Sequence, residues 1–259
     1  MNQPASSAAV TTRRVLMPAT PARTPKPPSM PEELLPFTVR LVRDEEDLNK
    51  AVQIRHAAYA RHMPAVAESL RLPEKIDTED GVVVLLAESK LDGSPLGTAR
   101  IQTNQFRPLG LEESVELPDW LRGQSLAHIS RLGIVQGSGG RLVKFMLFKG
   151  LFKYWEQNGV DWAVVAARTP LDRMYQQLLF EDVFPGQGFT PLPHMNNVPH
   201  RVMAFEVATA FERWTQAKHP LTNFICHTDH PDLDVSRIDN DAYSPVYAKS
   251  QPMSFHIAQ

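Results

Sequence analysis

Cysteine, net charge and long apolar runs are all scarce in this sequence. Among 259 residues Cys226 is the one cysteine, which excludes an internal disulfide and a multi-cysteine zinc site and indicates a reducing, cytoplasmic setting. The 27 Lys and Arg residues nearly balance the 29 Asp and Glu residues, so no overall field attracts the chain to nucleic acid. No run approaches the roughly 18 apolar residues of a membrane span, and we expect a soluble protein.

Acidic residues are also absent before Glu32, whereas the first 36 residues hold eight prolines. Proline lacks the N–H that helices and paired strands need, so we predict a disordered, proline-rich leader over residues 1–36. The basic, Ser- and Thr-containing start also resembles a transit peptide, but the prolines oppose the amphipathic helix of such a peptide. We therefore prefer the disordered leader.

The rest of the composition, 42% hydrophobic and 22% charged, is typical of a globular protein with one core. Because the prolines bunch at both ends, we predict one domain over residues 37–218, followed by an extended C-terminal tail over residues 219–259.

The pattern of apolar residues predicts an α/β (α+β) domain. Alternation predicts a strand at residues 37–42, and Asp44 with three acidic residues after it predicts a helix that runs to His62. Asp92-Gly93 indicates a hairpin. The other predicted elements are strands at 81–91, 96–103, 126–135, 162–167 and 201–207, and helices at 141–158, 169–180 and 209–218.

A glycine-rich turn, Gln136-Gly-Ser-Gly-Gly-Arg141, precedes the longest predicted helix. Backbone N–H groups at such a helix start can bind a phosphate, because glycine permits close approach and the helix dipole favours negative charge. A plain tight turn is the alternative. No Lys-Ser/Thr pair follows, so the turn is not a P-loop, and the third small residue of a dinucleotide fingerprint is missing.

Four short motifs occur in an order that is typical of one superfamily. They are Arg55 with Tyr59, Asp77 and Asp80 spaced three apart, Arg100 after Gly97-Thr98, and His128-Ile-Ser-Arg131. Over Phe37 to Val207 the chain thereby resembles the acetyltransferase-like GNAT superfamily, and especially its branch of N-acyl amino acid synthases and acyl-homoserine lactone synthases.

The resemblance implies a single GNAT-like domain whose mixed central sheet, flanked by helices, has two splayed strands. It implies an N-acyltransferase that moves a fatty acyl group, expected to be long-chain, from an acyl carrier protein to the amine of an amino acid or related small amine. The phosphopantetheine thioester would be a substrate, with acyl-CoA the second choice, and no cofactor or metal would be permanently bound. The donor would contact Ile129, Ser130, Leu132, Ile134, Gln136, Gly137, Gly139, Gly140 and Arg141.

The same resemblance assigns roles to the acceptor-binding and catalytic residues. Asp77 and Asp80 would hold the acceptor ammonium, Arg55 or Arg100 would pair with its carboxylate, and Tyr59 would lie beside them. His128 stands where the family usually has a carboxylate base, and a neutral imidazole can take a proton from an amine. Arg131 completes this catalytic motif. Structural ion pairs and a structurally paired His are the alternatives.

Residues 175–180, Tyr-Gln-Gln-Leu-Leu-Phe, resemble the Tyr-x-x-Leu-Gly-Phe motif of the superfamily, with Leu179 in place of the glycine. A phenol with a pKa near 10 stays protonated at neutral pH, so Tyr175 is the candidate general acid for the departing thiolate. A tyrosine packed under the sheet is the alternative.

Arg141 occupies the last small position of the coenzyme A signature, so the turn would hold the pyrophosphate of that donor less well. Four cations on the helix, Arg141, Lys144, Lys149 and Lys153, are candidates for docking an acidic carrier protein, and a solvated helix face is the alternative.

Two further groups of residues are weaker candidates. Cys226, His227, Asp229, His230 and Asp232 fit no common zinc spacing, and Phe145, Met146, Phe148, Phe152 and Trp155 could line an acyl channel or simply form core. The alternative functions are a non-catalytic acyl-carrier or acyl-lipid binding module and a lactone synthase that uses S-adenosylmethionine.

Overall fold

The computed structural model describes residues 30–236 except 138 and 196. Most of the predicted leader and residues 237–259 of the predicted tail lie outside the described residues. The compact unit begins at Pro31.

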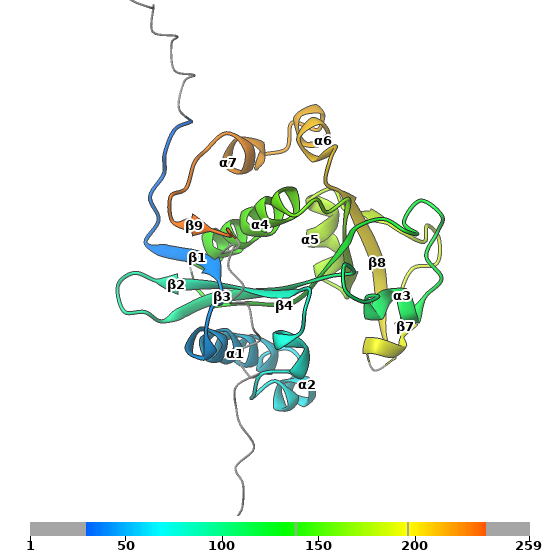
Figure 1. Cartoon of the computed structure of the whole chain (residues 1–259), viewed down its shortest axis with the longest axis horizontal. Helices are drawn as coiled ribbons and strands as arrows, with labels where there is room; N and C mark the ends of the chain where they lie inside the picture. Colours follow the sequence, from blue (N-terminus) through cyan, green and yellow to red (C-terminus); the bar gives the residue numbers. More distant parts are fainter. Residues whose placement is uncertain (1–29, 138, 196, 237–259) are drawn as a thin grey trace, which may run out of the picture. The chain divides into compact units, whose positions relative to one another are not determined.

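The described strands form one mixed sheet in the order β6-β8-β5-β4-β3-β2-β1-β9, with β7 paired to β8 (Figure 1). The neighbours β4 and β5 are parallel, as are β1 and β9, and the other pairs are antiparallel. The strands are β1 Phe37–Leu41, β2 Val82–Ser89, β3 Pro95–Thr103, β4 Leu126–Ile134, β5 Trp162–Ala167, β6 Glu181–Asp182, β7 Thr190–Leu192, β8 Val198–Glu206 and β9 Leu233–Asp234.

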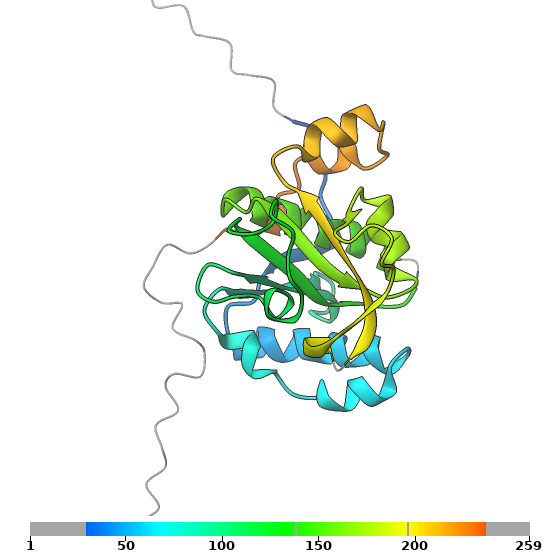
Figure 2. The same ribbon diagram turned by 90° about the vertical axis from the view of Figure 1, so that its right-hand side faces the viewer.

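Helices cover both faces of this sheet. The helices α1 and α2 lie on one face, and α4 and α5 lie on the other, with α6 and α7 beyond α4 (Figure 1). Figure 2 shows the same layers from the side of β8, with α1 below the sheet and α6 above it. The helices are α1 Glu45–Ala60, α2 Pro64–Ser69, α3 Gly110–Ser114, α4 Gly140–Gln157, α5 Leu171–Gln177, α6 Ala210–Gln216 and α7 Thr222–Cys226, with short 3₁₀ turns η1 Lys75–Thr78 and η2 Pro193–Met195.

The long elements begin where the sequence predicts them. Asp44 is the N-cap of α1, because its side chain accepts a hydrogen bond from the Asp47 N–H at 2.8 Å. The apolar sides of α4 fill the largest core cluster, which it shares with β1 to β5 and β8. A smaller cluster lies under α1, and a third lies around α3 and β5. The predicted mixed sheet flanked by helices is confirmed.

The first part of the predicted tail is folded onto the domain. Residues 222–226 form α7, and β9 pairs with β1 through Val39–Leu233 and Arg40–Asp234. The expectation of an extended tail is therefore wrong for residues 219–236, because Leu233 and Val235 are buried in the main core. None of the helices in the described part of the chain is long and apolar enough to cross a lipid bilayer.

Candidate active site

The two central strands β4 and β5 are paired only at their beginnings. Their parallel ladder joins residues 126–129 to residues 162–165, whereas β4 continues to Ile134 and β5 to Ala167. Beyond Ile129 the ladder stops, which leaves the edge of β4 that faces β5 open up to Ile134, whose carbonyl accepts from the Arg61 side chain at 2.8 Å. This opening is the splay that the resemblance implies, and it is where the backbone of β4 can meet an extended ligand.

A bulge in β4 lies at the start of the open edge. Arg131 has a φ of +55°, in the left-handed region that non-glycine residues seldom adopt. The pairing with β3 shifts register here, between Thr98–Gly133 and Arg100–Ser130. The extra residue bends the strand and directs the Arg131 side chain to the cluster described below.

The glycine-rich turn requires its glycines for different reasons. Gly137 has a φ of +108°, and a Cβ on Gly140 would lie 2.5 Å from the Val135 carbonyl oxygen. The space at Gly139 is open. The turn brings the free N–H groups of the α4 N-terminus close to the end of β4, which suits an anion.

Three arginines and two carboxylates form a cluster on the α1 face of the sheet. Arg55 donates to both Asp77 oxygens at 2.8 and 3.0 Å. Arg100 donates to Asp77 at 3.1 Å and to Glu74 at 3.0 Å. Arg131 donates to both Glu74 oxygens at 2.6 Å. We call these five residues the arginine–carboxylate cluster.

Burial within this cluster corrects the predicted acceptor contacts. The side chains of Arg55 and Asp77 are 0% exposed, and each Asp77 oxygen already accepts from an arginine, so these two residues hold each other rather than a substrate. Arg100 is also buried, and its Nε donates to Ser130 Oγ. Asp80 is exposed on the surface and outside the cluster.

Glu74 is the member of this cluster that sequence reasoning missed. Glu74 lies three residues before Asp77, and Asp80 lies three residues after it. The expected acidic pair spaced three apart therefore fits both Glu74–Asp77 and Asp77–Asp80, and spacing alone cannot choose between them. The backbone N–H of Glu74 donates to Asp77 at 2.8 Å, which fixes the two carboxylates together at η1. Glu74 and Arg131 are the accessible end of the cluster, with side chains 23% and 21% exposed.

The cluster keeps both carboxylates charged. Burial alone would raise the pKa of Asp77, but hydrogen bonds and charge from Arg55, with the charge of Arg100, hold the pKa below its usual value. Burial would likewise raise the pKa of Glu74. The hydrogen bond from Arg131 and the charges of Arg100 and Arg131 outweigh burial, so this pKa also lies below its usual value. The Arg131 guanidinium lies over the Tyr59 ring, 5.8 Å from the ring centroid. Tyr59 is therefore a neighbour of the arginine–carboxylate cluster.

His128 is buried on the same face of the sheet, next to the cluster. It is 4% exposed, and its Nε2 has no hydrogen-bond partner. Burial, together with the charges of His194, Arg100 and Arg131, lowers the pKa of His128 to about 3. The ring is therefore neutral at pH 7, as a base must be, but it holds an accepted proton weakly.

Tyr175 lies on α5, across the sheet from His128. Its ring meets Phe148 and Phe180 edge to face, with centroids 6.0 and 5.1 Å apart. Burial, and secondarily Tyr59, raises the pKa of the Tyr175 phenol, which keeps it protonated at neutral pH. Leu179 has a φ of +69°, a conformation that favours glycine, which is the residue the superfamily motif has there.

The four predicted docking cations differ in their position and exposure. Arg141 and Lys144 flank the glycine-rich turn, and both lie over the Phe145 ring, at 5.5 and 5.7 Å. Lys149 is buried and donates to the Phe224 carbonyl at 2.9 Å, to the Thr228 carbonyl and to His230, so its predicted docking role is wrong. Lys153 is partly exposed one turn further along α4.

The tail residues weighed as metal ligands are used in structural contacts. His230 bonds Lys149 at 2.8 Å, Asp232 accepts from the Leu35 N–H at 2.8 Å, and His227 meets the Phe211 ring edge to face. Within the described residues no group of three or more such side chains could hold a metal ion.

The aromatic and Met side chains on α4 that could line an acyl channel are mostly core. Met146, Phe148, Phe152 and Trp155 are buried in the largest cluster.

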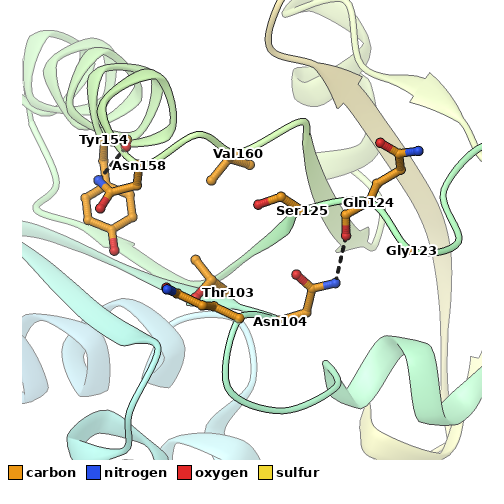
Figure 3. Close-up of a pocket in the computed structure, with 9 residues that line it drawn as sticks. Thr103, Asn104, Gly123, Gln124, Ser125, Tyr154, Asn158 and Val160 are labelled. Carbon is orange, nitrogen blue, oxygen red and sulfur yellow. Dashed lines mark hydrogen bonds between the residues drawn. The ribbon is translucent and has the colours of Figure 1, made fainter.

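A pocket of about 460 Å³ lies at the other end of β4, between Thr103, Ser125 and Asn158 (Figure 3). Asn104 there donates to the Gln124 carbonyl at 3.0 Å. None of the predicted site residues lines this pocket.

The fold of this domain is similar to the folds of solved enzymes that transfer acyl groups. One solved structure with this fold is FeeM, an N-acyl amino acid synthase from uncultured soil microbes, at 16% identity and a TM-score of 0.53, with 73% of this chain and 96% of that chain covered. Another is BjaI, a CoA-dependent acyl-homoserine lactone synthase, at 14% identity and a TM-score of 0.50, with 78% and 96% covered. No protein-family model matches the sequence, and no curated protein matches it.

Proposed function

We propose that the chain is an N-acyltransferase that moves an acyl group from a thioester to a small amine. The observation that carries this proposal is the open edge of β4 after Ile129. Unpaired backbone groups there can hydrogen-bond the amides of a pantetheine arm, and a β4 N–H can stabilise the oxyanion that forms when the thioester is attacked. The fold shared with FeeM supports the same reaction class.

The proposed transfer needs no covalent enzyme intermediate. The acceptor nitrogen attacks the thioester carbon, a C–N bond forms, and the C–S bond breaks with its electron pair on sulfur. Tyr175 is the proton donor to this sulfur, since its phenol is protonated and lies on α5, the helix that follows β5.

The acceptor we propose carries a carboxylate beside its amine, as an amino acid does. The arginine–carboxylate cluster has one more guanidinium than carboxylates, and Arg131 is its accessible cation. A substrate carboxylate would balance this charge. An amino acid should therefore react with a KM at least about tenfold lower than its methyl ester, because one lost charge-assisted contact of about 1.5–3 kcal/mol corresponds to that ratio or more.

The donor we propose is an acyl carrier protein. Arg141 fills the position where the coenzyme A signature has a small residue, and it lies with Lys144 in the first turns of α4, which follows the end of β4. The positive charges of these two side chains would attract an acidic carrier protein. Arg141→Glu with Lys144→Glu should raise the KM for the acyl carrier protein in a salt-dependent way. Lys218→Glu, an exposed change near α6, should leave this KM unchanged.

Thiol release tests the whole proposal. Full-length protein is incubated with acyl carrier proteins or acyl-CoAs of several chain lengths and with a pool of amino acids, and free thiol is titrated while amides are detected by mass spectrometry. Amide formed in step with thiol supports the enzyme. Tight donor binding without thiol release would instead support a non-catalytic acyl-carrier binding module, which the weak basicity of His128 favours.

A further inference from the structure

A second histidine lies beside His128 on the α1 face of the sheet. His194 belongs to η2, and its ring centroid is 6.2 Å from that of His128, edge to face. The ring rests against Gly110 of α3, where an added Cβ would lie 3.3 Å from the nearest ring atoms. His194 therefore depends on α3 and η2, which are remote from His128 in sequence.

Hydrogen bonds to Ser114 fix the tautomer of His194. The Ser114 hydroxyl donates its single hydrogen to the Gly110 carbonyl at 2.7 Å. Its oxygen lies 2.6 Å from His194 Nδ1 and also accepts from the His194 backbone N–H at 3.4 Å. Because the hydroxyl hydrogen is already used, Nδ1 must carry a hydrogen and donate it. In the neutral ring Nε2 then has a free lone pair.

This lone pair is buried and has no protein partner. The Nε2 atoms of His194 and His128 are both buried without a hydrogen bond, and such atoms are costly unless a ligand or water binds them. Resting on the acyltransferase function proposed above, we propose that His194 Nε2 is the catalytic base that binds the acceptor amine and takes its proton, with Ser114 as the positioning residue.

The proton balance of this step is complete. As the amine nitrogen forms the C–N bond, its N–H bond breaks and the hydrogen passes to His194 Nε2. The thiolate that leaves takes a proton from the Tyr175 phenol. The imidazolium then releases its proton to solvent, and the phenolate regains one, so the reaction is redox-neutral and yields one amide and one thiol.

The surroundings favour His194 over His128 as the base. His128 faces two guanidinium groups, Arg100 and Arg131, besides His194 and His200. His194 faces His200 of β8 and the carboxylate of Glu113 on α3, and Glu113 raises its pKa against the lowering by burial and by His200. An imidazolium formed at His194 thus has the Glu113 carboxylate near it, whereas the charges of Arg100 and Arg131 disfavour one formed at His128.

The test compares kcat, KM and pH profiles of the full-length protein and its variants, with the donor and amine found by thiol release. His194→Asn keeps a side-chain N–H near the Nδ1 position for Ser114 but removes the base. We expect kcat to fall about 10²-fold or more, with little change in donor KM and with loss of the acidic limb of the profile. Ser114→Ala should reduce kcat less. His56→Gln, at a partly exposed position of α1, is the matched histidine control and should behave as wild type.

A second measurement is independent of turnover. Long-range ¹H–¹⁵N NMR of the imidazoles should show His194 with a protonated Nδ1 and an unprotonated Nε2, and this pattern should be lost in Ser114→Ala. An Nε2-protonated tautomer, or a His194→Asn enzyme with unchanged kcat and pH profile, overturns the proposal. If the wild type releases no thiol, the proposed acyltransferase function is wrong. The NMR tautomer of His194 still tests separately whether Ser114 holds the ring with Nε2 unprotonated.

Discussion

At the scale of single residues, burial determines which polar side chains are able to meet a substrate. Asp77 and Asp80 look equivalent in the sequence, yet one is enclosed by arginines and the other is exposed. Residue type and spacing selected Arg55, Arg100 and Asp77, which do lie in one cluster, but assigned them to a substrate, whereas in the structure they hold each other. They could not indicate that Glu74 is the second carboxylate, because this depends on how η1 packs against β3 and β4.

Asp77→Asn and Asp80→Asn make a matched pair of substitutions. The first leaves the buried Arg55 and Arg100 without a full counter-charge, so we expect it to lower the free energy of unfolding by about 3–5 kcal/mol. The second changes a surface carboxylate and should stay within about 0.5 kcal/mol. Urea denaturation followed by circular dichroism measures both. Equal effects would show that the cluster does not stabilise the fold.

The same pair predicts an acid dependence of stability. The pKa of Asp77 is lower in the folded protein than in the unfolded chain, where it is near 3.8. The contribution of Asp77 is thus complete above about pH 4 and is lost as the pH falls through the folded value. The wild-type curve of stability against pH should drop more steeply below pH 4 than that of Asp77→Asn. Parallel curves would contradict this assignment.

Tyr175→Phe tests the proposed acid with little disturbance of packing. Phenylalanine keeps the edge-to-face contacts with Phe148 and Phe180, while the proton for the thiolate is lost. We expect kcat to fall about 10²-fold or more with donor affinity nearly unchanged. Steady-state kinetics with a thiol probe give both values. A variant that turns over like the wild type would remove Tyr175 from the mechanism.

At the scale of elements, the turn before α4 depends on a close backbone approach at one glycine. Gly140→Ala puts a methyl group 2.5 Å from the Val135 carbonyl oxygen, and Gly139→Ala meets nothing within 4 Å. We expect the first to lower stability by roughly 1–3 kcal/mol, and the second to have little effect on the melting temperature. Differential scanning calorimetry compares them directly. If both variants melt together, the turn can shift to accept the methyl group.

The long elements could be predicted from the sequence and the short ones could not. Asp44 and the hairpin at Asp92-Gly93 carry local signals that the structure follows. The elements α2, η1, α3 and η2 have three to six residues each, too few for an apolar period to be visible. Ser114 lies in α3, His194 lies in η2 and Glu74 is the N-cap of η1, and for this reason these three residues were beyond sequence reasoning.

At the scale of the whole described domain, Lys149 joins α4 to the C-terminal segment. Lys149→Ala would leave the Phe224 and Thr228 carbonyls without this donor, so we expect a loss of about 1–3 kcal/mol and faster amide exchange over residues 222–234. Lys153→Ala, one helical turn away, is the control and should change neither. Hydrogen exchange with mass spectrometry measures the segment, and unchanged exchange in Lys149→Ala would show that β9 holds it alone.

Glu32 bridges Asp229, and the Leu35 N–H donates to Asp232, so the chain enters and leaves the domain side by side at the β1–β9 edge. The strands β3, β2 and β1 lie between the edge strand β9 and β4, so the lateral distance is about 19 Å at the usual strand spacing. A surface tether or a fluorophore attached at either end of the domain would therefore leave the mouth of the splay clear, which makes immobilised binding assays with bulky carrier proteins practicable.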